Sequence, residues 1–323
     1  MTSQSAKRET PRHRPFRALV TGGAGFIGSN LAIRLLAEGH EVIVVDNLSR
    51  GQRRNVPAGA EFVRLDIGDR RLHRLLAQER PEIIFHLAAH INLRESVADP
   101  AADAQVNVVG SLNLLRAAAE SGVRRLVFSS SGGAMYNAPP RFPALEKHAE
   151  CPLSPYGVAK RAFELYLESA RQTTGLDYVA LRYANVYGPR QDTAGEAGVV
   201  AIFIEKILAG QPLKVFGDGG QTRDFVFVGD VVDANLRAAT AAAASGLGIN
   251  IGTGVETSVN EVAELVAAAF GRPAKIKRFP PVPGELRRSA LDWRLAKKTL
   301  GWKPTVKIDE GIRLTADWFR EKR

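Results

Sequence analysis

The chain has 323 residues, of which 45% are hydrophobic and 24% charged, an ordinary composition for one large domain or two packed ones. Its single cysteine, Cys151, excludes an internal disulfide framework and is consistent with a reducing compartment, so we expect a cytoplasmic protein. No apolar run approaches the roughly 20 residues that a membrane helix needs.

The formal net charge is +10. Such an excess can attract nucleic acid or a membrane surface, but it equally suits an anionic diphosphate substrate or simply reflects an arginine-rich composition. We expect neither a nucleic-acid nor a membrane partner.

The first 15 residues are polar and basic and contain two prolines. They lack the apolar core of a secretory signal, so we interpret residues 1–15 as a disordered basic tail.

From residue 17 the pattern alternates between short apolar strands and helical stretches. The first helical stretch places Ile27, Leu31 and Leu35 on one face and ends near Gly39. Continuous apolar strands alternating with helices are typical of a parallel sheet covered on both faces. The expected strands are 17–21, 41–46, 61–66, 81–89, 123–131 and 176–186. The pattern therefore predicts an α/β fold with a Rossmann-like doubly wound parallel sheet.

After about residue 185 the alternation weakens, and glycine- and proline-rich stretches intervene. Two helices remain recognisable there. One follows a capping box at Ser258 and Glu261 and stops at Gly271, and the other covers 292–301. We therefore predict a dinucleotide-binding domain over 16–184, with later returns near 225–252, and a smaller C-terminal α/β substrate lobe over 185–323.

The turn after the first strand, TGGAGFIGSN, places Gly22, Gly25 and Gly28 between a strand and a helix. Residues without side chains let the backbone approach a pyrophosphate, and the helix N-terminus supplies N–H groups and a positive dipole end. The second strand ends at Asp46, where a carboxylate can accept hydrogen bonds from ribose hydroxyls and repel a 2′-phosphate. The arrangement favours NAD, although Arg50 and its neighbours leave NADP open.

Two further strand ends should reach the same crevice. Asp66 is placed to contact the adenine, and the small Ala88 and Ala89 leave room for a dinucleotide. His86 and His90 are four apart, but at a strand end that spacing does not converge on a metal, and we expect no metal site.

The segment SPYGVAK places Tyr156 and Lys160 one helical turn apart, ahead of an apolar helical run. On a helix the two side chains share a face. A nearby ammonium stabilises a phenolate and lowers the pKa of the phenol from about 10 toward neutrality. The pair therefore predicts a general base that takes a proton from a sugar hydroxyl while a hydride leaves the same carbon.

Motifs spread from about residue 18 to 305 together resemble the extended short-chain dehydrogenase/reductase family, in its NAD-dependent nucleotide-sugar epimerase branch. They are TGGAGFIGSN, VVDNLS, FHLAA, VFSSSGGAMY, SPYGVAK, LRYANVYGPRQ, FGDGGQTRDFVFVGDV and PGELRRSALD…LGWKP. The resemblance implies NAD as cofactor, a homodimer, and 4-epimerisation of a UDP-hexose through a 4-keto intermediate.

The resemblance also implies site residues. The cofactor positions are Gly22, Gly25, Phe26, Ile27, Gly28, Asp46, Asn47, Asp66, Ile67, Leu87, Ala88, Ala89, Asn107, Tyr156 and Lys160. The substrate positions are Asn185, Val199, Phe216, Arg223 and Arg287. Phe216 would contact uridine and the two arginines would bind phosphate, although Phe216 also suits a core and Arg223 could pair with Asp224 or Asp230.

One position departs from the family pattern. Relatives place a serine or threonine, which bonds the reacting sugar hydroxyl, four residues before a tyrosine. Counting back from Tyr136 reaches Gly132, whereas counting back twenty-five from Tyr156 reaches Ser131. We favour Ser131 for this third catalytic group, with Ser130 as the alternative.

Other reactions stay open at this stage. Dehydratases of the family carry an Asp-Glu pair after the catalytic hydroxyl, and residues 132–134 contain no acid. A UDP-glucuronate epimerase or decarboxylase, a 4-ketoreductase, or a non-catalytic dinucleotide-binding regulator each fit part of the pattern. A small residue at Ser289 suggests that N-acetylated sugars are also accepted.

Overall fold

The computed structural model describes residues 14–137, 139–193, 198–282, 284 and 286–322. All but two residues of the expected basic tail therefore lie outside the described residues. A seven-stranded sheet, parallel throughout, forms the centre of the larger part, in the order β11-β6-β5-β4-β1-β2-β3. Its strands are β1 (Arg17–Thr21), β2 (Glu41–Asp46), β3 (Glu61–Arg64), β4 (Ile83–His86), β5 (Arg125–Ser131), β6 (Asp177–Tyr183) and β11 (Leu247–Ile251). The expected doubly wound parallel sheet is confirmed.

Helices cover both faces of this sheet, which explains why its strands are apolar without alternation. Leu19 of β1 packs into one core and its neighbour Val20 into the other. The first of these two cores includes residues of α2 (Arg71–Glu79), α5 (Ser111–Glu120) and α7 (Pro155–Thr174). The second includes residues of α1 (Phe26–Ala37), α9 (Val228–Thr240) and α11 (Arg294–Leu300).

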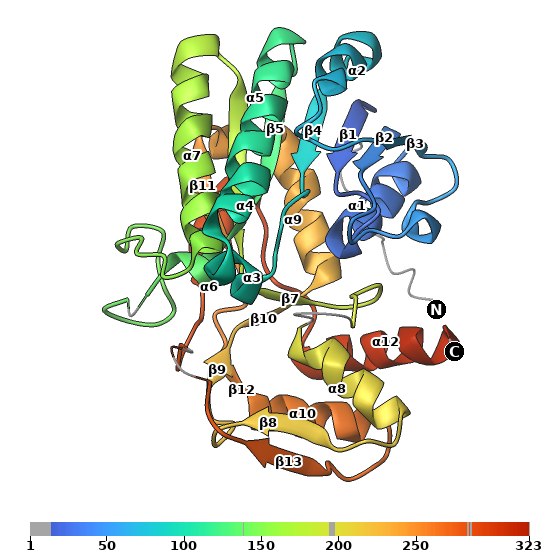
Figure 1. Cartoon of the computed structure of the whole chain (residues 1–323), viewed down its shortest axis with the longest axis vertical. Helices are drawn as coiled ribbons and strands as arrows, with labels where there is room; N and C mark the ends of the chain where they lie inside the picture. The colour runs from blue at the N-terminus through green and yellow to red at the C-terminus, as the bar shows by residue number, and fades with distance from the viewer. Residues whose placement is uncertain (1–13, 138, 194–197, 283, 285, 323) are drawn as a thin grey trace, which may run out of the picture.

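The substrate lobe has a core of its own at one end of the molecule (Figure 1). Its helices are α8 (Val199–Leu208), α10 (Val259–Ala269) and α12 (Ile308–Glu321). They pack with the parallel pair β8 (Leu213–Phe216) and β13 (Ile276–Phe279). The capping box expected at the start of α10 is present, because Ser258 and Glu261 each bond the other's backbone N–H.

Two short strand pairs join the lobe to the sheet. They are the parallel pair β7 (Asn185–Tyr187) with β10 (Phe225–Phe227), and the antiparallel pair β9 (Thr222–Arg223) with β12 (Thr257–Ser258).

The chain passes between the two parts more than once. It returns to the sheet for α9 and β11, and it returns again near Trp302, a fully buried side chain that donates a hydrogen bond to the Asp230 carbonyl. The sequence suggested only the first of these returns. It also did not reveal α8, α9 or α12.

Shorter elements connect these layers. They are α3 (Leu93–Ala98), α4 (Pro100–Ala104), the π-helical turn η2 (Gln105–Gly110), α6 (Gly132–Met135), and the 3₁₀ turns η1 (Arg53–Asn55) and η3 (Ala242–Ala244). Within the described residues, no helix combines the length and the apolar character that crossing a bilayer demands.

Candidate active site

The turn between β1 and α1 depends on its glycines. Gly22 has a positive φ of 68°, and a Cβ at this position would lie 2.7 Å from the Ala88 nitrogen. A Cβ on Gly28 would lie 2.3 Å from the carbonyl oxygen of Gly22, a distance that no real side chain tolerates. Gly25 is the N-cap residue of α1, and no side chain caps this helix end. The backbone is thus bare where an anionic group would approach the helix.

Asp46 holds this turn against the end of β2. Its carboxylate accepts hydrogen bonds from the backbone N–H groups of Ala24, at 3.0 Å, and Leu48, at 2.8 Å. Asn47 in turn donates to Asp66 at 2.6 Å, which links the ends of β2 and β3. These contacts hold both carboxylates at the carboxyl edge of the sheet.

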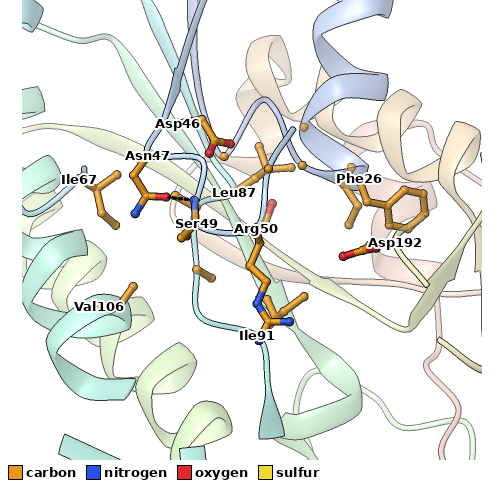
Figure 2. A pocket seen from close by; sticks show the side chains of 18 of the residues that line it. Phe26, Asp46, Asn47, Ser49, Arg50, Ile67, Leu87, Ile91, Val106 and Asp192 are labelled. Carbon is orange, nitrogen blue, oxygen red and sulfur yellow. Dashed lines mark hydrogen bonds between the residues drawn. The ribbon is translucent and has the colours of Figure 1, made fainter. Parts of the chain in front are cut away.

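A cavity of about 300 Å³ lies at this edge (Figure 2). Fourteen of the fifteen expected cofactor positions line it, and Asn107 is the exception. The fourteen are Gly22, Gly25, Phe26, Ile27, Gly28, Asp46, Asn47, Asp66, Ile67, Leu87, Ala88, Ala89, Tyr156 and Lys160. The cavity extends from the loop after β2 to α7 and is lined by the turn glycines, which fits a dinucleotide. Asp46, the carboxylate expected to bind the ribose, and the Tyr156/Lys160 pair come from different elements.

Asn107 lies beneath the loop that follows β4. Its side-chain NH₂ donates to the His90 carbonyl at 2.8 Å and to Asp103 at 3.0 Å, while its oxygen accepts from the His90 N–H at 2.8 Å. The residue is 3% exposed. It therefore supports the wall of the cavity rather than lining it.

Tyr156 and Lys160 both come from the first turns of α7, which Ser154 caps by accepting from the Gly157 N–H. The Lys160 ammonium donates to the Ser129 carbonyl at 2.9 Å and lies 5.7 Å from the centre of the Tyr156 ring. The shared helix face expected from their spacing brings both groups into the cavity.

Ser131 and Ser130 have different environments at the end of β5. The Ser131 hydroxyl lies close enough to the Tyr156 phenol to lower the pKa of that phenol, whereas Ser130 donates to Glu164 at 2.6 Å on the buried side. Gly132 faces Leu291, and a Cβ there would lie 2.4 Å from the leucine Cδ1. A serine or threonine would therefore not fit at position 132 without repacking, and the geometry favours Ser131 over Ser130.

Burial dominates the electrostatics of this pair. It raises the pKa of Tyr156 to about 12, against the hydrogen bond from Ser131, which lowers it. Burial also lowers the pKa of Lys160 to about 8, although Asp103 and Glu164 act in the opposite direction. The stabilisation of a phenolate expected from the lysine is thus outweighed in the protein alone, and Tyr156 is a neutral phenol at pH 7.

The two histidines near β4 have structural partners. His86 is fully buried and hydrogen-bonded to the hydroxyls of Thr21 and Ser111, and burial lowers its pKa to about 3. His90 contacts Glu95 at 2.7 Å and Asp103 at 3.3 Å. Across the described part of the chain, no three His, Cys, Asp or Glu side chains gather as a metal would require.

The expected substrate residues lie outside this cavity, on the side of the lobe. Arg287 forms a two-point ion pair with Asp218, at 2.7 and 2.8 Å. Arg223 donates to the carbonyls of Thr222 and Leu286. Phe216 is 39% exposed beside Phe279. Asn185 and Val199 begin β7 and α8. None of the five lines the cavity described above, although the segments of Arg223 and Arg287 are adjacent, since the Thr222 N–H donates to the Arg287 carbonyl at 2.9 Å.

The cavity also has lining residues that the sequence did not mark as cofactor contacts. Arg50 extends over it toward Ile91 and pairs with Glu95 at 3.3 Å, so this arginine faces α3 (Figure 2). Tyr183 and Gln191 line the cavity from the segment around β7. In the sequence Arg50 is one of several arginines that follow Asp46, and no local motif indicates that Tyr183 lines the cavity.

A parallel sheet in this strand order, with a glycine turn and an acidic residue after the second strand, defines a Rossmann-like dinucleotide-binding protein. The sequence pattern of the NAD dependent epimerase/dehydratase family matches residues 18–252, and the chain belongs to this family. The match confirms the resemblance to extended short-chain dehydrogenases and NAD as the cofactor.

Individual proteins are similar over nearly the whole length. The UDP-glucose 4-epimerase of Mycolicibacterium smegmatis is 51% identical over 95% of this chain and 99% of its own. The Thermotoga maritima UDP-glucose 4-epimerase, solved with UDP-glucose, is 46% identical with a TM-score of 0.92, covering 95% of this chain and 99% of that one. The Thermus thermophilus UDP-glucose 4-epimerase complex with NAD is 47% identical with a TM-score of 0.88, covering 94% and 99%.

Proposed function

We propose that the chain catalyses the NAD-dependent 4-epimerisation of a UDP-hexose, interconverting UDP-glucose and UDP-galactose. The observation that carries this proposal is the pair Tyr156 and Lys160 lining a dinucleotide cavity of the matching family, with the Ser131 hydroxyl close enough to the phenol to lower its pKa. The 51% identity to an epimerase over almost the full chain supports the choice of reaction.

In this mechanism Tyr156 takes the proton of the sugar 4-hydroxyl and later returns it to the oxygen of the 4-keto sugar. NAD, when bound, supplies the positively charged acceptor for the C4 hydride and gives that hydride back on the other face. Ser131 bonds the reacting oxygen, and Lys160 stabilises the negative charge that develops on the phenol. Protons and hydride balance over the cycle, so no external reductant is consumed.

Inversion requires the 4-keto sugar to turn while its diphosphate stays anchored. We assign the anchor to Arg223 and Arg287, whose forked guanidinium groups suit phosphate oxygens. Phe216 would contact the uridine, and Asn185 and Val199 would contact the diphosphate or sugar. In the structure Arg287 faces Asp218, so substrate binding exchanges one anionic partner for another.

A panel of UDP-sugars incubated without added NAD, followed by separation of the C4 epimers, tests the proposal. Conversion of UDP-glucose to UDP-galactose without net NADH formation supports it. A product that appears only with consumption of NADPH would instead identify a 4-ketoreductase, and release of CO₂ from UDP-glucuronate a decarboxylase. Including UDP-N-acetylglucosamine tests whether the small Ser289 admits acetamido sugars.

We also propose that the enzyme is a homodimer. An exposed apolar face runs along α3, η2 and α7, which pack against one another. Its members are Val97, Val109, Val158, Leu165 and Tyr166, each between 45% and 64% exposed. Self-complementary pairing of such a face across a two-fold axis buries it in both copies. Leu165→Glu should convert the dimer to a monomer in light scattering, and a wild-type chain that is already monomeric would refute the assignment.

A cytoplasmic location completes the proposal. It is supported by the single cysteine, which is exposed and free. Fractionation of the producing cell would test it.

A further inference from the structure

Lys160 is a buried cation with little hydrogen bonding to support its charge. The residue is 4% exposed, and its ammonium donates to the Ser129 carbonyl and lies 4.7 Å from the centre of the Phe128 ring. Taking an ammonium out of water disfavours its charged form strongly unless an opposite charge compensates. The proposed reaction nevertheless needs this ammonium charged, because it stabilises the phenolate.

Two buried carboxylates lie close enough to Lys160 to affect its charge, but one of them is already neutralised. Glu164 is bound by the Arg182 guanidinium at 3.1 and 3.2 Å from Nε, and it also accepts from Ser130. Its negative charge is therefore balanced by an arginine.

Asp103 is the second carboxylate, and it is fully buried on α4, which packs against α7. One oxygen, Oδ1, accepts from Asn107 at 3.0 Å and contacts the His90 ring at 3.3 Å. The other, Oδ2, has no hydrogen-bond partner within the described residues, although it is inaccessible to solvent. A buried carboxylate oxygen left without a donor is costly. The negative charge of Asp103 raises the pKa of both Lys160 and Tyr156.

We propose that Asp103 is a positioning residue for the proposed reaction, and that its buried carboxylate is the counter-charge that keeps the Lys160 ammonium protonated. The inference rests on the proposed function, since it assigns how the Tyr156/Lys160 pair of that reaction is maintained.

The other titratable groups around Lys160 do not supply this charge. His86, from β4, is neutral because burial lowers its pKa to about 3. Tyr156 is a neutral phenol in the protein alone. Asp103 raises the pKa of Lys160 against the effect of burial. Its effect on that pKa is larger than the effect of Glu164. His90 bridges Asp103 and Glu95 at the edge of the site, and Glu95 pairs further out with Arg50.

The test is Asp103→Asn, which removes the charge and keeps the oxygen that accepts from Asn107. In the wild type the alkaline limb of kcat should lie near the Lys160 pKa of about 8. In the variant this limb should move down by about one pH unit, so kcat at pH 8 falls about fivefold while the KM for UDP-glucose changes little. Asp103→Glu retains the charge and should keep the limb close to its original position.

Asp99→Asn is the matched control. Asp99 is the exposed N-cap of the same helix and accepts from the Ala102 N–H, a role that asparagine fills equally well. Asp99→Asn removes the same unit charge as Asp103→Asn and should leave the pH profile of kcat unchanged. A fall in kcat by the same factor at every pH in Asp103→Asn, with an unmoved alkaline limb, overturns the proposal. If Asp103→Asn does not fold, the pH profile of kcat is measured instead in Asp103→Ser, which also lacks the negative charge, with the same expected and contradicting results.

Titration of Lys160 itself, by NMR of protein labelled at the lysine ε-carbon, separates this inference from the proposed function. The Lys160 signal is assigned by its loss in Lys160→Met. A lower pKa of Lys160 in Asp103→Asn supports the counter-charge even if the wild type epimerises no UDP-sugar, which would refute only the proposed function. An unchanged pKa of Lys160 in an active enzyme overturns the counter-charge alone.

Discussion

The dinucleotide half of the protein and the substrate lobe hold their site residues by different means. At the glycine turn the constraint is steric: Gly22 and Gly28 lie so close to backbone atoms that no side chain fits. In the lobe the expected phosphate ligands are long arginine side chains: Arg223 is half-buried, and the exposed Arg287 already has Asp218 as an anionic partner. A site built by backbone contacts is formed before its ligand arrives, whereas a site built from flexible side chains is completed by the ligand.

Tyr156→Phe should produce the largest effect, and this effect should be confined to catalysis in the cofactor half of the protein. Removing the hydroxyl abolishes proton transfer, so kcat should drop by about 10²–10⁴-fold while UDP-sugar binding persists. Steady-state kinetics and calorimetric binding of UDP-glucose measure the two parts. Tyr166→Phe, on the exposed face of the same helix, is the control, and near-normal turnover of Tyr156→Phe would contradict the assigned role.

Gly28→Ala tests whether the turn is as intolerant as its geometry indicates. Alanine would favour the helix by about 1 kcal/mol. The Cβ would nevertheless lie 2.3 Å from a backbone oxygen, and we expect this clash to dominate. NAD affinity should fall at least about a hundredfold, or the fold should be lost. Gly25→Ala, where the nearest atom would lie 3.2 Å away, should be milder in the same calorimetric titration. Equal NAD affinities for the two variants would contradict the steric constraint assigned to Gly28.

His86 gives the cofactor half an acid sensitivity that begins below pH 6.5, and residues 185–323 contain no histidine. The unfolded imidazole binds a proton below pH 6.5, whereas the folded one does so only near pH 3. The free energy of unfolding should therefore fall with decreasing pH between these values, by up to about 1.4 kcal/mol per pH unit. Denaturant titrations of His86→Gln should show a flatter pH dependence than the wild type.

The smallest effect is expected in the lobe, where Asp218 competes for Arg287. Arg287→Gln should raise the KM for UDP-glucose by about tenfold with little change in kcat, because it removes binding made equally in ground and transition states. Asp218→Asn should lower that KM by about threefold, consistent with the modest strength of an exposed ion pair. Arg288→Gln, which loses the pair with Glu256 and the contact with the Phe142 ring, is the control. If KM rose in Asp218→Asn, the two partners would not be in competition.

The sequence predicted the parts of the molecule whose signals are local. The turn from Gly22 to Gly28, the strand-terminal Asp46 and the Tyr156/Lys160 spacing each belong to one continuous stretch of chain. The helix over 259–269 was found through its capping box, and α7 has a Ser154 cap. The three missed helices, α8, α9 and α12, have no side-chain cap at their first turn, so the capping signal that located α10 is absent from them.

What the sequence did not predict depends on partners distant along the chain. Asn107 matches a cofactor position in its motif, yet tertiary packing directs its amide to His90 and Asp103. Arg287 and Asp218 are 69 residues apart, and neither local pattern indicates the other. Ser130 and Ser131 have different surroundings because neighbouring residues of β5 point to opposite faces of the sheet, and the Glu164 that accepts from Ser130 is 34 residues away along the chain.

The repeated passage of the chain between sheet and lobe has a consequence for engineering. β11 belongs to the sheet and Trp302 to the core on one face of it, yet both follow lobe segments, so the lobe consists of separate stretches interleaved with the larger part. Exchanging sugar specificity with a relative by a single crossover would divide the sheet. A functional chimera must instead transplant three stretches together, including α8, then α10 with β13, and finally α12.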